Sequence, residues 1–260
     1  MFNTKIQWSD STVNFWTGCQ KVSEGCKYCY MYRGKERNGE DPSIVQRVGN
    51  SSFTAPLYWE EPRKIFTCSY SDFFISDGDQ WRDEAWAVIR ETPQHSWQIL
   101  TKRPERISEC LPADWGQYGY SNTWLGVSIA NENEKHRLGT LQRIKSPESR
   151  FLTFLSIEPL ISPVDFLNCD EKLRKDFSNI NWVIIGGESG NSYGKYRYRE
   201  CQLEWIEGIV EQCKEFEIPV FVKQLGTHLA KQMVLKDWVG GEPMEWPENL
   251  KIRQFPVTNN

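Results

Sequence analysis

Residues 182–190 read Trp-Val-Ile-Ile-Gly-Gly-Glu-Ser-Gly and contain the pattern that decides the fold. A short run of large apolar side chains is followed by glycines and polar side chains. Within the run, apolar residues do not alternate with polar ones. Strands that are buried on both faces have this continuous apolar character, whereas strands with one wet face alternate. Residues 182–185 are therefore predicted to form a buried strand that leads into a polar loop.

The same unit recurs along the chain. Further apolar runs that precede polar clusters lie at 64–67, 97–100, 123–127, 151–156 and 219–222. Apolar side chains at helical spacing separate several of these runs, within 79–91, 138–144 and 203–213. Repeated alternation of strands and helices predicts an α/β fold with parallel strands, either a barrel or a doubly wound sheet.

The polar clusters favour the barrel. They follow the predicted strands at 69–72, 101–103, 128–131, 158, 186–189 and 223–224. In a barrel, the carboxyl ends of all strands surround one mouth, whereas an open sheet divides them about a switch point. We predict a complete or partial TIM-type (β/α) barrel of parallel strands. It would be one domain over residues 1–260, with 227–260 as a C-terminal extension and a short first strand near 14–17.

Composition sets the broad class. The chain has 260 residues, of which 39% are hydrophobic and 25% charged, and no apolar run approaches the ~18 residues of a membrane span. The N-terminus lacks the apolar segment of a secretory signal, so a cytoplasmic location is expected. The formal net charge of -4 argues against a broad basic surface, but not against a local basic pocket. Most of the 12 tryptophans are expected to fill the core.

The strongest chemical signal is the spacing C-x6-C-x2-C of Cys19, Cys26 and Cys29. In a reducing cytosol, cysteines serve as thiols or metal ligands rather than disulfides. Three close thiols with no histidine nearby suit an iron–sulfur cluster. Three ligands on a [4Fe-4S] cluster leave one iron open for S-adenosylmethionine. Its reductive cleavage yields a 5′-deoxyadenosyl radical, while the protein supplies position and exclusion of water.

Two other classes of protein remain open. The three cysteines could bind structural zinc with a distant fourth ligand such as Cys68, in a nucleic-acid-binding module without catalysis. They could also hold a cluster in a non-catalytic iron–sulfur sensor or electron-transfer protein.

The order of motifs resembles a phage-associated family of radical-SAM-like three-cysteine proteins, within or near the radical SAM superfamily. The matching positions lie at 8–10, 12, 14, 17–30, 62–66, 69–72, 100–105, 124–128, 155–160, 182–190 and 221–224, so the resemblance extends from about Ile6 to Gly226. The superfamily's commonest spacing is C-x3-C-x2-C, so this chain has a longer first gap and keeps the second. The resemblance implies a radical S-adenosylmethionine enzyme that needs an external electron donor.

The strand ends supply the candidate site residues. The resemblance to radical SAM enzymes implies that Ser69, Ser71 and Asp72 hold the cofactor's amino group, although Ser and Asp also form caps and turns. Arg103, like Lys102, could meet the cofactor's carboxylate or a substrate phosphate. Ser128, Gly187 and Glu188 complete the predicted cofactor-binding set.

Glu158 and Lys102 are the predicted catalytic residues. The carboxylate of Glu158 follows a buried strand, where a charge requires a pocket or a partner. Lys102, Arg103 and Lys223 suit a phosphate, so the expected substrate is a nucleotide or nucleic acid, with a small metabolite as the alternative. The oligomeric state and the substrate itself stay open.

Overall fold

The computed structural model describes residues 1–257 of the chain. The backbone divides into two compact units. Unit 1 comprises Met1–Val22, Met31–Val127 and Thr140–Thr153, and unit 2 comprises Ser23–Tyr30, Ser128–Gly139 and Phe154–Asn260. Residues 258–260, at the end of the proposed C-terminal extension, lie outside the described residues. The assignment of 1–260 to a single domain stays a prediction.

Parallel strands form the main sheet, in the order β1-β4-β5-β6-β7-β8-β9. Unit 1 contains β1 (Ser11–Val13), β4 (Lys64–Thr67), β5 (Ser96–Thr101) and most of β6 (Thr123–Ser128). Unit 2 contains most of β7 (Leu152–Ile157), together with β8 (Trp182–Gly186) and β9 (Val220–Gln224). The predicted α/β fold with parallel strands is confirmed, and its form is the partial (β/α) barrel.

The buried strands lie where the continuous apolar runs predict them. Every residue of β6 and β8 is buried, which explains why neither strand shows polar alternation. Neighbouring strands of the main sheet pair in parallel within each unit, with Ile65 opposite Trp97 in unit 1 and Ile185 opposite Val222 in unit 2. Because the strands run in one direction, the polar residues that follow them collect at one edge within each unit.

The predicted first strand near 14–17 is wrong. The first strand of the main sheet is β1, and β2 (Trp16–Thr17) pairs antiparallel with β3 (Gln46–Arg47) in a separate sheet. Asn14 separates the two strands, because its side-chain Oδ1 accepts a hydrogen bond from the backbone N–H of Tyr70 at 2.8 Å. Asparagine side chains that bond the backbone in this way compete with strand pairing.

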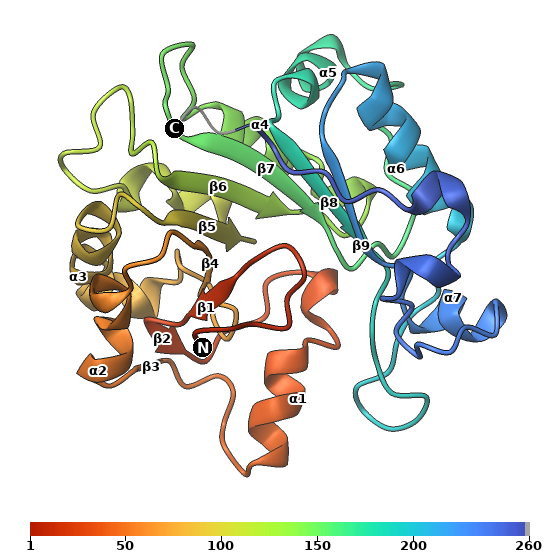
Figure 1. Ribbon diagram of the computed structural model, residues 1–260, viewed down its shortest axis with the longest axis horizontal. Coiled ribbons are helices and arrows are strands. Elements are labelled where there is room, and N and C mark those ends of the chain that lie inside the picture. Colours follow the sequence, from red (N-terminus) through yellow and green to blue (C-terminus); the bar gives the residue numbers. More distant parts are fainter. Residues whose placement is uncertain (258–260) are drawn as a thin grey trace. The chain divides into compact units, whose positions relative to one another are not determined.

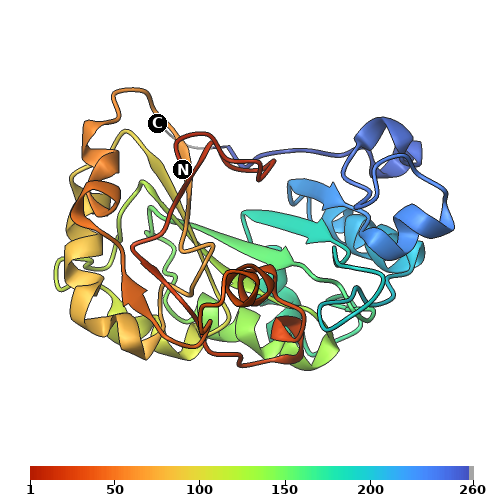
Figure 2. The same cartoon turned by 90° about the horizontal axis from the view of Figure 1, so that it is seen from below.

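The helices fall between the strands along the chain, except α7, which follows the last strand (Figure 1). They are α1 (Tyr30–Arg37), α2 (Asn50–Phe53), α3 (Asp79–Arg90), α4 (His136–Gln142), α5 (Glu171–Ser178), α6 (Leu203–Glu215) and α7 (Thr227–Gln232). In α3 an aspartate opens the helix and an arginine closes it, which complements the helix dipole. In unit 1, α2 and α3 lie side by side in both views (Figures 1 and 2), and the ion pair of Arg47 with Glu84 at 2.6 Å joins α3 to the segment before α2.

Aromatic side chains dominate the core of unit 1. Trp16, Trp86 and Trp97 are fully buried, and the ring of Trp97 stacks on Phe15 with centroids 5.8 Å apart. Burial of one such side chain stabilises the fold by about 1.5–3 kcal/mol. Eight of the 12 tryptophans are buried, as expected, whereas Trp238 is exposed. Within residues 1–257, no helix is both long and apolar enough to cross a membrane.

Candidate functional site

The end of β4 in unit 1 turns sharply into a polar segment. Cys68, the next residue, has φ of 57°, in the left-handed region that costs a non-glycine residue about 1–2 kcal/mol. The turn is closed by a hydrogen bond from the Ser71 backbone N–H to the Cys68 carbonyl at 2.9 Å. It directs Ser69, Ser71 and Asp72 away from the strand. The Ser69 hydroxyl lies 3.4 Å from the Asn14 side chain.

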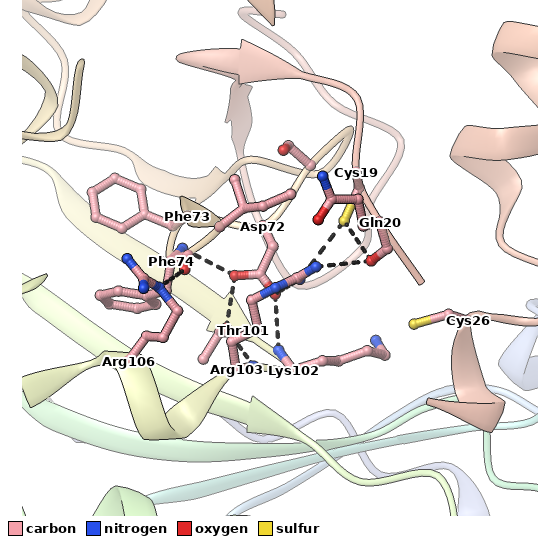
Figure 3. A network of polar contacts seen from close by, with 12 residues as sticks. Cys19, Gln20, Cys26, Asp72, Phe73, Phe74, Thr101, Lys102, Arg103 and Arg106 are labelled. Atoms are coloured by element: carbon pink, nitrogen blue, oxygen red, sulfur yellow. Dashed lines mark hydrogen bonds and ion pairs between the residues drawn. The ribbon is translucent and has the colours of Figure 1, made fainter. Parts of the chain in front are cut away.

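Asp72 is the centre of a buried polar network (Figure 3). Its Oδ1 accepts hydrogen bonds from the Thr101 hydroxyl at 2.7 Å and the Phe74 N–H at 3.0 Å. Its Oδ2 accepts from the Lys102 N–H and from Arg103 Nη1, both at 3.0 Å. The carboxylate is therefore fully used by its own chain, and it joins the ends of β4 and β5. The Lys102 ammonium points away from it (Figure 3).

Arg103 connects this network to the first cysteine. The guanidinium is buried, with Nη1 3.0 Å from Asp72 and 3.8 Å from the Cys19 sulfur, while Nη2 donates to the Gln20 carbonyl at 2.8 Å. Burial acts to lower the pKa of Arg103, but Asp72 and Cys19 oppose it and the pKa lies above its usual value. Arg103 is therefore a fixed cation beside Cys19.

The segment around Cys19 is held at several further points. Gly18 has φ of 92°, and a Cβ there would lie 2.0 Å from the Ile44 carbonyl oxygen, so only glycine fits. The Ser71 hydroxyl donates to the Gly18 carbonyl at 2.5 Å, and the Tyr32 hydroxyl donates to the Cys19 carbonyl. The Cys19 N–H donates to the Pro42 carbonyl at 2.9 Å. Cys19 therefore has a well-defined backbone position in unit 1.

In unit 2, an arginine holds the segment that carries Cys26 and Cys29. Glu24–Cys26 form one turn of 3-10 helix, and Arg199 Nη1 donates to the Glu24 carbonyl at 2.9 Å. Arg199 itself is fixed by Glu188, with Nε to Oε2 at 2.8 Å and Nη2 to Oε1 at 2.6 Å. Its guanidinium carbon lies 5.3 Å from the centre of the Tyr28 ring. Glu188 is buried, so its charge depends on Arg199 for compensation.

A second ion pair lies across the ends of β7, β8 and β9. Glu158 follows β7, and its Oε1 is 2.5 Å from the Nζ of Lys223 in β9. Between them lies Gly186 of β8, where an added Cβ would be 3.4 Å from the Glu158 side chain. Both side chains are partly open to solvent. The Ser128 hydroxyl donates to the Glu158 carbonyl at 3.1 Å. These residues place a carboxylate and an ammonium together at one strand edge.

Gly187, which follows β8, and Gly226, which follows β9, lie in close contact. A Cβ on Gly187 would lie 2.1 Å from the Leu225 carbonyl oxygen, and Gly226 faces Gly187 with φ of 89°. The Gln224 side chain donates to the Gly187 carbonyl at 2.9 Å. The glycines therefore allow β8 and β9 to leave the sheet in contact, which brings Glu188 to Arg199.

The cysteines fall into two classes. Cys19, Cys26 and Cys29 of the motif are half-buried, as is the distant Cys169, whereas Cys68, Cys110, Cys201 and Cys213 are buried. Burial raises the pKa of the Cys68 and Cys201 thiols to about 12, and it also raises the pKa of Cys213. Metal binding requires the thiolate, so these buried thiols are packing groups.

The donor chemistry of the motif fits an iron–sulfur cluster. It offers three thiols on a short segment, and among the described residues His95, His136 and His228 all lie on other segments. Within residues 1–257, no group of three or more Cys, His, Asp or Glu side chains is already gathered for a metal ion. Metal binding commonly completes the arrangement of its own ligands, because the binding free energy contributes to folding.

Several of these residues were predicted from the sequence as cofactor or substrate contacts, but in the structure they contact other residues of the chain. Asp72 and Arg103 contact each other, as do Glu158 and Lys223, while Ser71 contacts Gly18. Arg199 and Tyr32 were not singled out, because each acts on a backbone carbonyl far away in the sequence. The one available signal for Arg199 was the buried Glu188, which requires a cation.

The chain belongs to the family described as "Protein of unknown function (DUF5131)", whose model matches residues 3–245. No curated protein matches the chain. Among solved structures, the chain is similar to a mutant spore photoproduct lyase with bound AdoMet and dinucleoside spore photoproduct, with a TM-score of 0.47 and 13% identity. The match covers 83% of this chain and 64% of that one, so the chain spans less than two thirds of that protein's length.

Proposed function

We propose that this member of the DUF5131 family is a radical S-adenosylmethionine enzyme that holds a [4Fe-4S] cluster on Cys19, Cys26 and Cys29. The observation that carries the proposal is the support built around the cysteine segment. Arg103 binds the Gln20 carbonyl, Arg199 binds the Glu24 carbonyl, and a buried carboxylate fixes each arginine. A loop with no chemical role does not require two buried charge pairs, which are costly to desolvate.

The bound cluster and S-adenosylmethionine supply the one-electron cleavage that yields the 5′-deoxyadenosyl radical. The chain's own residues fix the ligands and exclude water around them. Arg103 and Arg199 act as positioning residues for the cysteine segment. Asp72 and Glu188, first predicted as cofactor contacts, act in this proposal by holding the two arginines.

Glu158 with Lys223, and Lys102, are the groups proposed to meet the cofactor or the substrate. Glu158 and Lys223 are partly open to solvent at the ends of adjacent strands, so each can exchange its partner for a ligand group. A carboxylate accepts hydrogen bonds from ribose hydroxyls, and an ammonium binds a carboxylate or a phosphate. The chemistry also requires an external electron donor, and we propose a cytoplasmic setting in which thiols stay reduced.

Anaerobic reconstitution tests the proposal. Wild type and a Cys19→Ala/Cys26→Ala/Cys29→Ala variant are loaded with iron and sulfide, reduced with dithionite and given S-adenosylmethionine. We expect about four irons per chain in wild type and 5′-deoxyadenosine from wild type alone. A Cys68→Ser/Cys201→Ser variant is the matched control, and it should keep both.

Two outcomes would contradict the proposal. Zinc bound in place of iron would favour a zinc-stabilised binding module. An intact cluster that never cleaves S-adenosylmethionine would favour a sensor or an electron-transfer protein.

A further inference from the structure

The loop that follows β8 in unit 2 has an unusual composition. Residues 191–199 read Asn-Ser-Tyr-Gly-Lys-Tyr-Arg-Tyr-Arg, with three tyrosines and three cations but no aspartate or glutamate. The whole chain carries a net charge of -4. This loop, called the Tyr193 loop below, is therefore a local concentration of positive charge and aromatic rings on an acidic protein.

The Tyr193 loop has an ordered base. Asn191 and Arg197 form a parallel bridge, and the Asn191 N–H donates to the Tyr196 carbonyl at 3.0 Å. The Tyr196 side chain is buried and anchors the loop, while Gly194 makes the turn at the tip with φ of 84°. A fixed loop loses less conformational entropy when it binds a ligand than a mobile segment does.

The tip presents its side chains to solvent. Tyr193 is 87% exposed, which is a large apolar surface for an isolated aromatic ring, and Lys195 and Arg197 beside it are also exposed. Lys231 of α7 adds a further cation, because its Nζ is 2.5 Å from the Ser192 hydroxyl and 5.1 Å from the centre of the Tyr198 ring. The exposed ring of Tyr193 and two cations therefore belong to one loop, and a third cation comes from the helix residue Lys231, which contacts that loop.

This combination matches one ligand chemistry. Exposed aromatic rings stack on unpaired bases while neighbouring cations bind the phosphates, and every base has a face on which to stack. A duplex hides those faces inside its own stack, so Tyr193 would have no partner there. An anionic protein segment would form ion pairs with the cations but would have no base to stack on the Tyr193 ring.

The base of the loop is joined to the cysteine segment. Arg199, its last residue, binds both Glu188 and the Glu24 carbonyl, and Glu24 lies two residues before Cys26. A ligand bound at the Tyr193 loop is therefore held on the structure that fixes Cys26.

We propose that the Tyr193 loop and Lys231 form a binding surface for single-stranded nucleic acid. Its role in presenting the substrate rests on the proposed radical chemistry, whereas the binding itself does not require a cluster.

Fluorescence anisotropy of labelled oligonucleotides tests the proposal. The probes are single-stranded oligo(dT), single-stranded oligo(U) and a DNA duplex, each titrated with the full chain at several salt concentrations. We expect both single strands to bind more tightly than the duplex. With about three phosphate contacts, log K should fall with log salt at a slope of about -2.

Two variants separate the ring from the charges. Tyr193→Ala should weaken binding about 5- to 100-fold, the range for loss of one stacked base, without changing the salt slope. Lys195→Ala/Arg197→Ala/Lys231→Ala should weaken binding and flatten the slope. The matched controls are Tyr58→Ala, an exposed tyrosine of unit 1, and Lys172→Ala/Lys175→Ala/Lys214→Ala, which removes the same charge from α5 and α6. Circular dichroism confirms that each variant is folded.

The outcomes distinguish this proposal from the proposed function. The triple cysteine variant should still bind the single strands, even though it makes no 5′-deoxyadenosine. Equal losses in the loop variants and their controls, or preference for the duplex, would overturn the nucleic-acid surface. Loop-dependent binding by a wild-type chain that never cleaves S-adenosylmethionine would instead leave the surface standing and remove the radical reaction.

Discussion

Unit 1 and unit 2 each hold part of the cysteine segment with an arginine that a carboxylate fixes. In unit 1, the Arg103–Asp72 pair is buried on both sides, with side chains 8% and 6% exposed, and the arginine also reaches the Cys19 sulfur. In unit 2, the Arg199 side chain is more open, at 18% exposed, and it contacts the Glu24 carbonyl and the Tyr28 ring.

The comparison shows that an arginine beside the cysteine segment can fix its backbone and can also direct an N–H group at a cysteine sulfur. Both arginines fix the backbone next to a cysteine, and Arg103 Nη1 also lies 3.8 Å from the Cys19 sulfur, where an N–H group can act on a ligand atom. The deeper pair also depends more strongly on each partner, because water cannot replace a lost contact there. The predictions below use this contrast.

Loss of Arg103 should have the largest effect on stability. Arg103→Met leaves the Asp72 carboxylate buried without its cation, so the free energy of unfolding should fall by about 3–5 kcal/mol. Arg199→Met should cost less, about 1.5–3 kcal/mol, because the Arg199 side chain is 18% exposed against 8% for Arg103, so water can reach Glu188 from the arginine side. Denaturant unfolding of both variants measures the difference.

The control for this contrast is Arg90→Met, which breaks the surface pair with Asp114 in unit 1. It should change the free energy of unfolding by less than about 1 kcal/mol. Equal costs for Arg103→Met and Arg199→Met would show that the two pairs do not differ in the way described.

The Glu158–Lys223 pair should matter for ligand binding more than for stability. Glu158→Gln removes a charged acceptor from the strand edge of unit 2. Binding of S-adenosylmethionine to the reconstituted protein should weaken about tenfold, which corresponds to one hydrogen bond to a charged group. The unfolding free energy should change by only about 1 kcal/mol, because the pair is partly exposed. Equilibrium dialysis provides the affinity, and unchanged binding would exclude Glu158 from the site.

A milder change at Arg103 should alter the cluster without unfolding the protein. Arg103→Lys keeps the positive charge beside Asp72 but loses the fork that reaches both Gln20 and Cys19. Hydrogen bonds to cluster sulfurs set the reduction potential, so the potential should become more negative. Arg199→Lys should shift the potential less, because Arg199 acts on the Glu24 backbone carbonyl and the Glu188 carboxylate. A redox titration followed by electron paramagnetic resonance measures both, and equal shifts would remove the proposed distinction.

The smallest effect should be a pH dependence confined to unit 1. His95 is buried there, and burial lowers its pKa below the usual 6.5, whereas His136 of unit 2 is exposed. The unfolded chain therefore binds a proton more readily than the folded one. The contribution of His95 to stability is fully present above about pH 6.5 and falls as the pH drops below it, by at most about 1.4 kcal/mol per pH unit.

Unfolding curves between pH 7.5 and pH 5 measure this slope. His95→Gln should flatten it, and His136→Gln should not. A slope that survives His95→Gln would assign the effect to other groups.

The fold was predictable because its strands are buried on both faces. Continuous apolar runs marked β4 to β9, and their ends fell within a few residues of the predicted positions. The first strand was misplaced because β1 is only three residues long and contains two hydroxyl side chains, so hydrophobicity gives it no signal. Its position depends on pairing with β4.

The sequence was sufficient to predict which residues lie at the strand ends of the candidate site, but not which residues they would contact. Polar residues after a strand identify an edge, yet they do not show that Asp72 is saturated by four donors from its own chain. Arg199 could not be found by spacing, because its partners Glu188 and Glu24 lie 11 and 175 residues away. Such contacts arise from tertiary packing, which a local pattern does not encode.

The central claim is that three cysteines of this chain hold a cluster with one iron open to S-adenosylmethionine. Mössbauer spectroscopy of protein reconstituted with 57Fe, with and without S-adenosylmethionine, tests it most directly. If the three cysteines hold the cluster, we expect a four-iron signal in which the isomer shift and quadrupole splitting of one iron change when S-adenosylmethionine is added. A signal that S-adenosylmethionine leaves unchanged, or a protein that takes up zinc and no iron, would contradict it.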